Sequence, residues 1–148
     1  MIRATHAKYV LDASVAAKWF TRHHEADRHK AVALRALYQS GRCQLVLPDF
    51  SLLEIVNAVR FSGRAEEADA TRALDLLESL RLGIVPLDWD LLRKATAIAW
   101  ACEVAVYDAA YVALAEREGI PLLTADDVMA GKMRGHGLVV RLAEMEFA

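Results

Sequence analysis

The chain has 148 residues, a hydrophobic fraction of 55% and a formal net charge of −2. This length suits one domain, which we place at residues 1–148, and the apolar fraction excludes a disordered chain. The near-neutral charge excludes nucleic-acid binding through a broad basic surface, so any such contact must be local. No apolar run is long enough for a bilayer span and no secretory signal is evident, so we expect a cytoplasmic protein with no membrane partner.

Short apolar strands alternate with helices along the chain. The strands are expected at residues 8–11, 44–47, 84–87, 121–125 and 138–142. Helices are expected at residues 13–20, 49–62, 64–82, 88–102, 108–118 and 127–134. One more helix follows the polar segment 21–27 and ends at residue 40. This alternation predicts an α/β fold with a mostly parallel sheet covered by helices on both faces. In open sheets of this kind, ligands bind at the carboxyl ends of the strands.

The stretch from Tyr107 to Asp127 reads as a helix, a tight turn and a strand. We expect Asp108 to begin the helix and Gly119 to end it. Twelve helical residues advance about 18 Å, and five extended residues return roughly 16 Å. Asp126 is therefore expected close to Asp108, although eighteen positions separate the two residues.

Two further acids are expected at the same edge of the sheet. Asp12 directly follows the first strand, as Asp126 follows the fourth. Glu54 lies five residues into a helix that begins after the second strand, only about 8 Å from that strand's end. Four carboxylates are thus expected at the carboxyl edge of the sheet, each carried by a different segment of the chain.

Crowded carboxylates repel one another and call for a counterion. A site built only from oxygen atoms suits Mg²⁺ or Mn²⁺, and such ions promote in-line displacement at phosphorus. The chemistry indicated is hydrolysis of a phosphodiester without a protein nucleophile. The sequence contains no competing Ser-His-Asp or Cys-His arrangement.

Each acid also has a purely structural explanation. Asp108 and Asp126 stand at helix starts, where aspartate is a favoured cap. Glu54 lies opposite the apolar stripe of its helix, so a solvated side chain is the simplest expectation. Asp12 is hardest to explain this way, because an acid directly after an apolar strand is expected to have little structural work to do. Ser14 and Thr124 either orient a carboxylate or water or serve as local caps.

Four segments resemble the PIN-domain ribonucleases, and more narrowly the VapC-type toxins of toxin-antitoxin pairs: YVLDASVAAKWF, LLEIVNAV, YDAAYVALA and LLTADD. The resemblance implies a three-layer α/β/α fold with sheet order 3-2-1-4-5. It implies Asp12, Glu54, Asp108 and Asp126 as the metal-binding and catalytic set, supported by Ser14, Asn57 and Thr124. It also implies an Mg²⁺- or Mn²⁺-dependent RNase acting on tRNA or rRNA, a homodimer, and silencing by a cognate VapB-like antitoxin.

Three other functions compete with this one. A non-catalytic PIN-like module that engages a protein partner remains the main alternative. An aspartyl-phosphate phosphohydrolase needs a second Asp two positions after the first, where this chain has Ser14. A dinucleotide-binding fold needs a glycine-rich turn after the first strand, which is absent.

RNA contact, if it occurs, is expected through cations near the proposed edge. These are Lys18, Arg22, His23, His24, Arg60, Arg64, Lys132 and Arg134. The aromatic residues Trp19, Phe50 and Phe61 are assigned either to the core or to a partner surface. Cys43 and Cys102 are expected to be reduced and partly buried.

Overall fold

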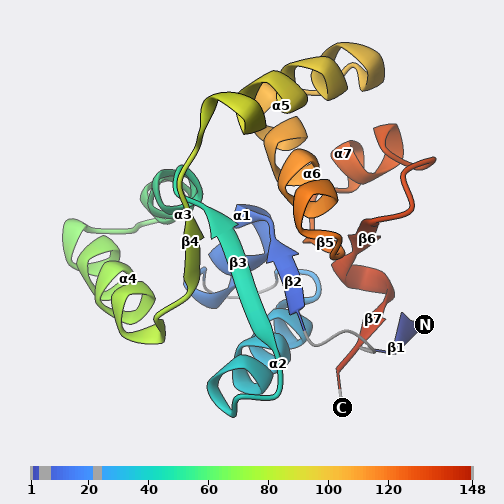
Figure 1. The fold of residues 1–148 in the computed structure, drawn as a ribbon. Coiled ribbons are helices and arrows are strands. Elements are labelled where there is room, and N and C mark those ends of the chain that lie inside the picture. The colour runs from blue at the N-terminus through green and yellow to red at the C-terminus, as the bar shows by residue number, and fades with distance from the viewer. Residues whose placement is uncertain (1, 4–7, 22–24, 148) are drawn as a thin grey trace.

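A computed structural model describes residues 2–3, 8–21 and 25–147, and a five-stranded parallel sheet lies at its centre (Figure 1). The strands follow the spatial order β4-β3-β2-β5-β6. Their bounds are β2 (Lys8–Leu11), β3 (Gln44–Pro48), β4 (Gly83–Val85), β5 (Leu122–Thr124) and β6 (Val139–Arg141). Counted along the chain, this is the order 3-2-1-4-5, which confirms the expected topology.

Helices connect every pair of consecutive strands in this sheet. They are α1 (Ala13–Ala16), the 3-10 helix η1 (Ala17–Trp19), α2 (Arg28–Gln39), α3 (Ser51–Arg60), α4 (Glu67–Leu80), α5 (Trp89–Cys102), α6 (Val106–Glu118) and α7 (Asp127–Lys132). The chain moves one way across the sheet from β2 to β4, then back to β5 and on to β6. Right-handed crossovers therefore place α1–α4 on one face and α5–α7 on the other. Three layers result, as Figure 1 shows.

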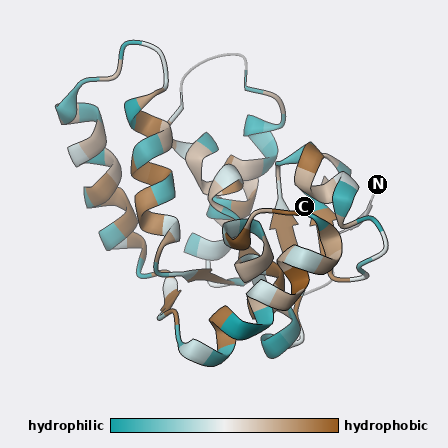
Figure 2. Cartoon of the chain, turned by 90° about the horizontal axis from the view of Figure 1, so that it is seen from above, coloured by the Kyte–Doolittle hydropathy of each residue, from teal (hydrophilic) through white to brown (hydrophobic). Residues whose placement is uncertain are grey.

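Helix α6 forms the centre of the second helical layer. Its residues from Ala109 to Ala115 are all buried, because the sheet covers one side of the helix and α5 covers another. A helix that is apolar around most of its circumference is stable only in such a buried position. Figure 2 shows the hydrophobic strands at the middle of the molecule, with the hydrophilic positions of the helices around them.

Several element boundaries differ from those expected. The expectation that Asp108 begins α6 is wrong, because the helix begins at Val106 after the extended residue Ala105, and Asp108 lies in its first turn. The segment 13–20 is α-helical for only one turn and then tightens into η1. A second small sheet was not expected: β1 (Ile2–Arg3) pairs in parallel with β7 (Met145–Glu146), just after a short 3-10 helix, η2 (Leu142–Glu144).

Both cysteines are free, with Cys43 buried and Cys102 partly buried, as expected. Across the described part of the chain, no single helix has the length and apolar character needed to cross a bilayer. The consecutive helices α5 and α6 reach that composition only when taken together, and they are bent by 116°.

The approach of β4 to β3 depends on Gly83. A Cβ atom on Gly83 would lie 2.9 Å from Val46 Cγ1 and 3.1 Å from the Leu45 carbonyl oxygen. We predict that Gly83→Ala lowers the free energy of unfolding by about 1–3 kcal/mol, the usual cost of overpacking. Urea denaturation measures this loss. Gly137→Ala is the control, because its Cβ would meet no atom within 4 Å; equal stability of the two variants would contradict the prediction.

Candidate active site

Asp12 lies where the two central strands of the sheet end. Strands β2 and β5 pair with Leu11 opposite Leu123, and the Asp12 N–H donates to the Leu123 carbonyl at 3.0 Å. The Thr124 hydroxyl at the end of β5 donates to Asp12 Oδ2 at 2.6 Å. The Asp12 side chain is buried, and burial raises the pKa of its carboxyl while the hydrogen bonds from Thr124 and Ser14 lower it.

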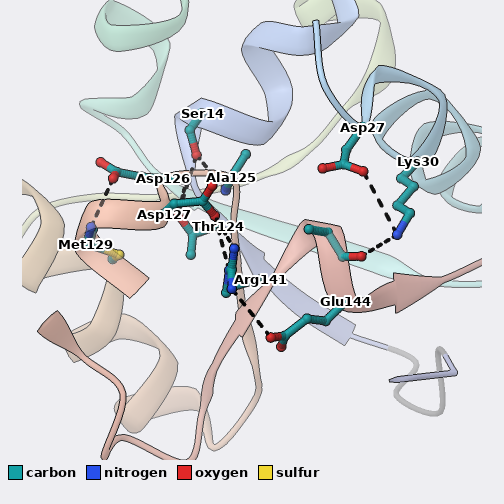
Figure 3. A network of polar contacts seen from close by, with 11 residues as sticks. Ser14, Asp27, Lys30, Thr124, Ala125, Asp126, Asp127, Met129, Arg141 and Glu144 are labelled. Carbon is teal, nitrogen blue, oxygen red and sulfur yellow. Dashed lines mark hydrogen bonds and ion pairs between the residues drawn. The ribbon is translucent and has the colours of Figure 1, made fainter. Parts of the chain in front are cut away.

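Ser14 links Asp12 to the loop after β5. Its hydroxyl donates to Asp12 Oδ2 at 2.9 Å and accepts from the Ala125 N–H at 3.0 Å. Figure 3 shows Ser14 pointing toward the backbone at Ala125. The Ser14 N–H also donates to Asp12 Oδ1, so that Asp12 caps α1. The expectation that Asp12 has little structural work to do is therefore wrong, because this carboxylate satisfies an N–H group at a helix start.

Asp126 is the N-cap of α7, which confirms the structural explanation that the sequence offered for this residue. Its Oδ1 accepts from the Met129 N–H at 2.9 Å, and its own N–H donates to the Thr124 hydroxyl at 3.0 Å (Figure 3). Thr124 therefore contacts both acids, because its hydroxyl donates to Asp12 and accepts from Asp126. The buried Thr124 side chain therefore links the chain after β2, at Asp12, to the chain after β5, at Asp126.

Glu54 projects from the first turns of α3 and is half-buried. Its Oε2 atom accepts from the Tyr111 hydroxyl at 3.4 Å, whereas its Oε1 atom is buried and has no hydrogen-bond partner in the described residues. Burial raises the pKa of Glu54 to about 7, and repulsion from Asp12 and Asp108 adds to the effect. The carboxyl group therefore takes up a proton near neutral pH in the metal-free protein.

Asp108 belongs to the same group of acids. Burial raises its pKa to about 6, and repulsion from Asp12 and Asp126 contributes, while the positive charge of Lys132 opposes the rise. Since Asp126 also raises the pKa of Asp12, each of the four acids interacts with at least two others. The structure thus brings Asp12, Glu54, Asp108 and Asp126 to one place, from four separate connections.

The chemistry of this acid cluster suits a hard divalent cation. All the charged groups in the cluster are carboxylates, and Glu54 Oε1 has no hydrogen-bond partner within the described residues, so this oxygen is available to bind an ion. In the described residues, no three His, Cys, Asp or Glu side chains form a group that could hold an ion as they stand. Asp12 and Asp126 accept hydrogen bonds from the protein instead. Uncompensated carboxylates repel one another, which favours their separation in the metal-free protein.

The remaining residues expected near the site are less closely involved. Asn57 is exposed, and its side chain makes no hydrogen bond with other described residues, so its supporting role stays a prediction. Lys132 donates to the Glu103 carbonyl, Trp19 is buried and Phe61 is exposed. Arg22, His23 and His24 lie outside the described residues.

Sequence reasoning missed Tyr111 and Ser51. Tyr111 is completely buried, and its hydroxyl donates to Ser51 Oγ at 2.9 Å as well as reaching Glu54. One signal was present in the sequence: Tyr111 is a large polar-tipped residue among alanines, one turn after Asp108. A buried tyrosine normally has a partner for its hydroxyl, which points to a polar group within the core.

A parallel sheet of this order, with acids gathered at its carboxyl edge, characterises a known class of proteins. The chain belongs to this class, the PIN domain family, whose model matches residues 9–132. Ribonuclease VapC3 from Pyrobaculum aerophilum is 33% identical over 129 residues, which cover 84% of this chain and 94% of that protein.

Two solved structures share the fold. A toxin-antitoxin complex from Klebsiella pneumoniae has a TM-score of 0.67 and 14% identity, covering 90% of this chain and 97% of that one. VapC20 from Mycobacterium tuberculosis, described as a Sarcin-Ricin loop cleaving toxin, has a TM-score of 0.59 and 19% identity, covering 83% and 93%.

We predict that Glu54→Gln stabilises the metal-free protein at pH 8. The folded-state pKa of about 7 exceeds the ordinary value of 4.5, so the stability associated with protonated Glu54 is lost as pH rises between these values. Removing the charge should restore on the order of 1 kcal/mol, less than the full shift implies because the side chain keeps some solvent contact. Thermal unfolding with a chelator present measures the gain. At pH 5 the variant and the parent should differ little, and a destabilised variant at pH 8 would contradict the prediction.

Proposed function

We propose that this chain is a Mg²⁺- or Mn²⁺-dependent endoribonuclease that acts as the VapC-type toxin of a toxin-antitoxin pair. The observation that carries the proposal is the convergence of four carboxylates at the carboxyl edge of the sheet, where burial and then mutual repulsion raise the pKa of Glu54 and Asp108. The 33% identity to a protein named as a ribonuclease supports the same reaction.

In this proposal Asp12, Glu54, Asp108 and Asp126 hold the cation. A bound divalent ion supplies a water of lowered pKa and stabilises the charge that develops on a phosphate during in-line attack. Ser14 and Thr124 keep the Asp12 carboxylate oriented through their hydroxyl groups. We propose that Lys132, whose positive charge lowers the pKa of Asp108, contacts an RNA phosphate beside the acids.

We propose structured RNA of the tRNA or rRNA class as the substrate. With a net charge of −2, the chain lacks a broad basic field, so recognition must come from local contacts and RNA shape rather than from bulk attraction. The description of a structural relative as a Sarcin-Ricin loop cleaving toxin supports a folded RNA substrate.

Cleavage of RNA tests the enzymatic part of the proposal. Purified protein with Mn²⁺ and total RNA should give discrete fragments, and Asp12→Ala or Asp108→Asn should lower the rate at least about 100-fold, since losing a ligand should exceed the 10- to 100-fold cost of losing an outer partner. Asp127→Asn is the matched control, because Asp127 neighbours Asp126 but pairs with Arg141 at the surface (Figure 3).

Two results would count against this activity. Cleavage that survives both chelation and the Asp12 and Asp108 substitutions would mean that the acid cluster is not the active site. Failure of the protein to bind Mn²⁺ in isothermal titration would favour the alternative of a non-catalytic PIN-like module, for which the absence of three ready-placed ligand side chains in the described residues is the supporting observation.

For partners, we propose a homodimer that a cognate VapB-like antitoxin silences. The Klebsiella relative is described as a toxin-antitoxin complex, which supports the second partner. Large exposed apolar side chains occur at the starts of α3, α5 and α6, namely Leu53, Leu87, Trp89 and Tyr107. These starts are linked, since Tyr107 packs on Phe50 and Asp49 accepts from the Leu87 N–H. Such an apolar patch on one side of the molecule supports self-association.

We predict that Trp89→Glu weakens the dimer at least 10-fold, because a charge would then be buried in an apolar interface without a partner. Light scattering across a concentration series measures the dissociation constant. Phe61→Glu is the control, since Phe61 is similarly exposed (73% against 75% for Trp89) but lies at the far end of α3. A monomeric parent protein, or equal weakening by both substitutions, would exclude this patch as the interface.

A further inference from the structure

The Tyr111 hydroxyl lies where three elements of the candidate site meet. It accepts from the Ala13 N–H of α1 at 3.3 Å and donates to Ser51 Oγ and Glu54 Oε2 of α3 at 2.9 and 3.4 Å. Tyr111 itself belongs to α6, one turn after Asp108. The Tyr111 hydroxyl oxygen therefore links three elements. Tyr111 lies on the helix that carries Asp108, and its oxygen contacts the elements that carry Asp12 and Glu54.

The surroundings of Tyr111 leave its ring no freedom to turn away. The side chain is 0% exposed, and the Phe50 ring packs edge-on against it with centroids 5.3 Å apart. Burial also raises the pKa of Tyr111 far above its usual value, so that the hydroxyl keeps its proton and remains a donor at every physiological pH. The donor is thus both fixed in position and permanently available.

This hydroxyl has one proton for two acceptors. Ser51 is neutral and completely buried, and it holds the shorter contact in the metal-free protein. A carboxylate that holds a divalent cation is charged, and hydrogen bonds to a charged acceptor are about twice as strong as neutral ones. Of the two carboxylate oxygens, Oε2 faces this donor, while Oε1 is buried and finds no hydrogen-bond partner in the part of the chain that the structure describes.

We propose that Tyr111 is the positioning residue for Glu54: its hydroxyl holds Oε2 and thereby leaves Oε1 as the oxygen that binds the divalent cation. The inference rests on the proposed metal-dependent function. Groups that hold a metal-binding side chain from behind reduce its freedom before the ion arrives, and losing them commonly weakens metal binding 10- to 100-fold. Tyr111 makes no contact with the substrate in this role.

Tyr111→Phe tests the role, because it removes the hydroxyl and keeps the ring. Isothermal titration with Mn²⁺ alone at pH 8 should show a dissociation constant at least about 10-fold weaker than that of the parent protein. Tyr9→Phe is the matched control, since Tyr9 is another fully buried tyrosine of the same core, on β2 and outside the acid cluster. That variant should bind Mn²⁺ like the parent, whatever its melting temperature.

Ser51→Ala provides a second test that keeps the Tyr111 hydroxyl in place. Removing the neutral acceptor leaves Glu54 as the remaining acceptor for the proton, so Mn²⁺ affinity should be unchanged or higher. Affinity that falls in Ser51→Ala as it does in Tyr111→Phe would assign the effect to the packing of the Tyr111 side chain against the start of α3 and overturn the proposal. Parent-like affinity in Tyr111→Phe would also overturn it.

The titration separates this inference from the proposed function. A parent protein that binds no Mn²⁺ would overturn both. A parent that binds Mn²⁺ and cleaves RNA, alongside a Tyr111→Phe variant that binds Mn²⁺ equally well, would overturn only the role of Tyr111. Weakened binding in Tyr111→Phe together with normal binding in Tyr9→Phe and Ser51→Ala would support the positioning role.

Discussion

The hydrogen bonds that hold the buried Asp12 carboxylate are the interaction on which the other features of the site depend. Thr124 and Ser14 donate to it from the ends of β5 and the start of α1, and so offset the cost of removing a charge from water. Burial is the largest cause of the raised pKa of Glu54, Asp108 and Tyr111, and the charge of Asp12 adds to the rise in each case. The carboxylate at the end of β2 is therefore electrostatically coupled to both neighbouring elements of the site, α3 and α6.

Two of the four acids have a structural role as well as the proposed chemical one. Asp12 caps α1 and Asp126 caps α7, so each accepts a hydrogen bond from a backbone N–H group. The same placement explains both roles, because a helix that begins directly after a strand puts its first residues at the carboxyl edge of the sheet. Substitution by asparagine preserves a capping oxygen and removes the charge, whereas alanine removes both.

Much of the fold could be predicted from the sequence because its strands are short apolar runs between clear turn residues. Asp12 and Asp126 were found by their position after such runs, and Glu54 by the rise of a helix. Tyr111 could not be paired with Glu54 in this way, since 57 positions separate them and only the folded chain brings the Tyr111 side chain to the start of α3. The start of α6 was misplaced because the residue before it, Ala105, has no capping side chain to mark the helix start at Val106.

The small second sheet and the 3-10 turn were not predicted either, because two-residue strands and one-turn helices carry no recognisable periodicity.

Strand length has a different consequence at the two edges of the main sheet. Its two outermost strands, β4 and β6, have three residues each, too few to template a strand from another molecule. Such short edges disfavour recognition by strand addition and leave helix surfaces and loops as the larger docking surfaces.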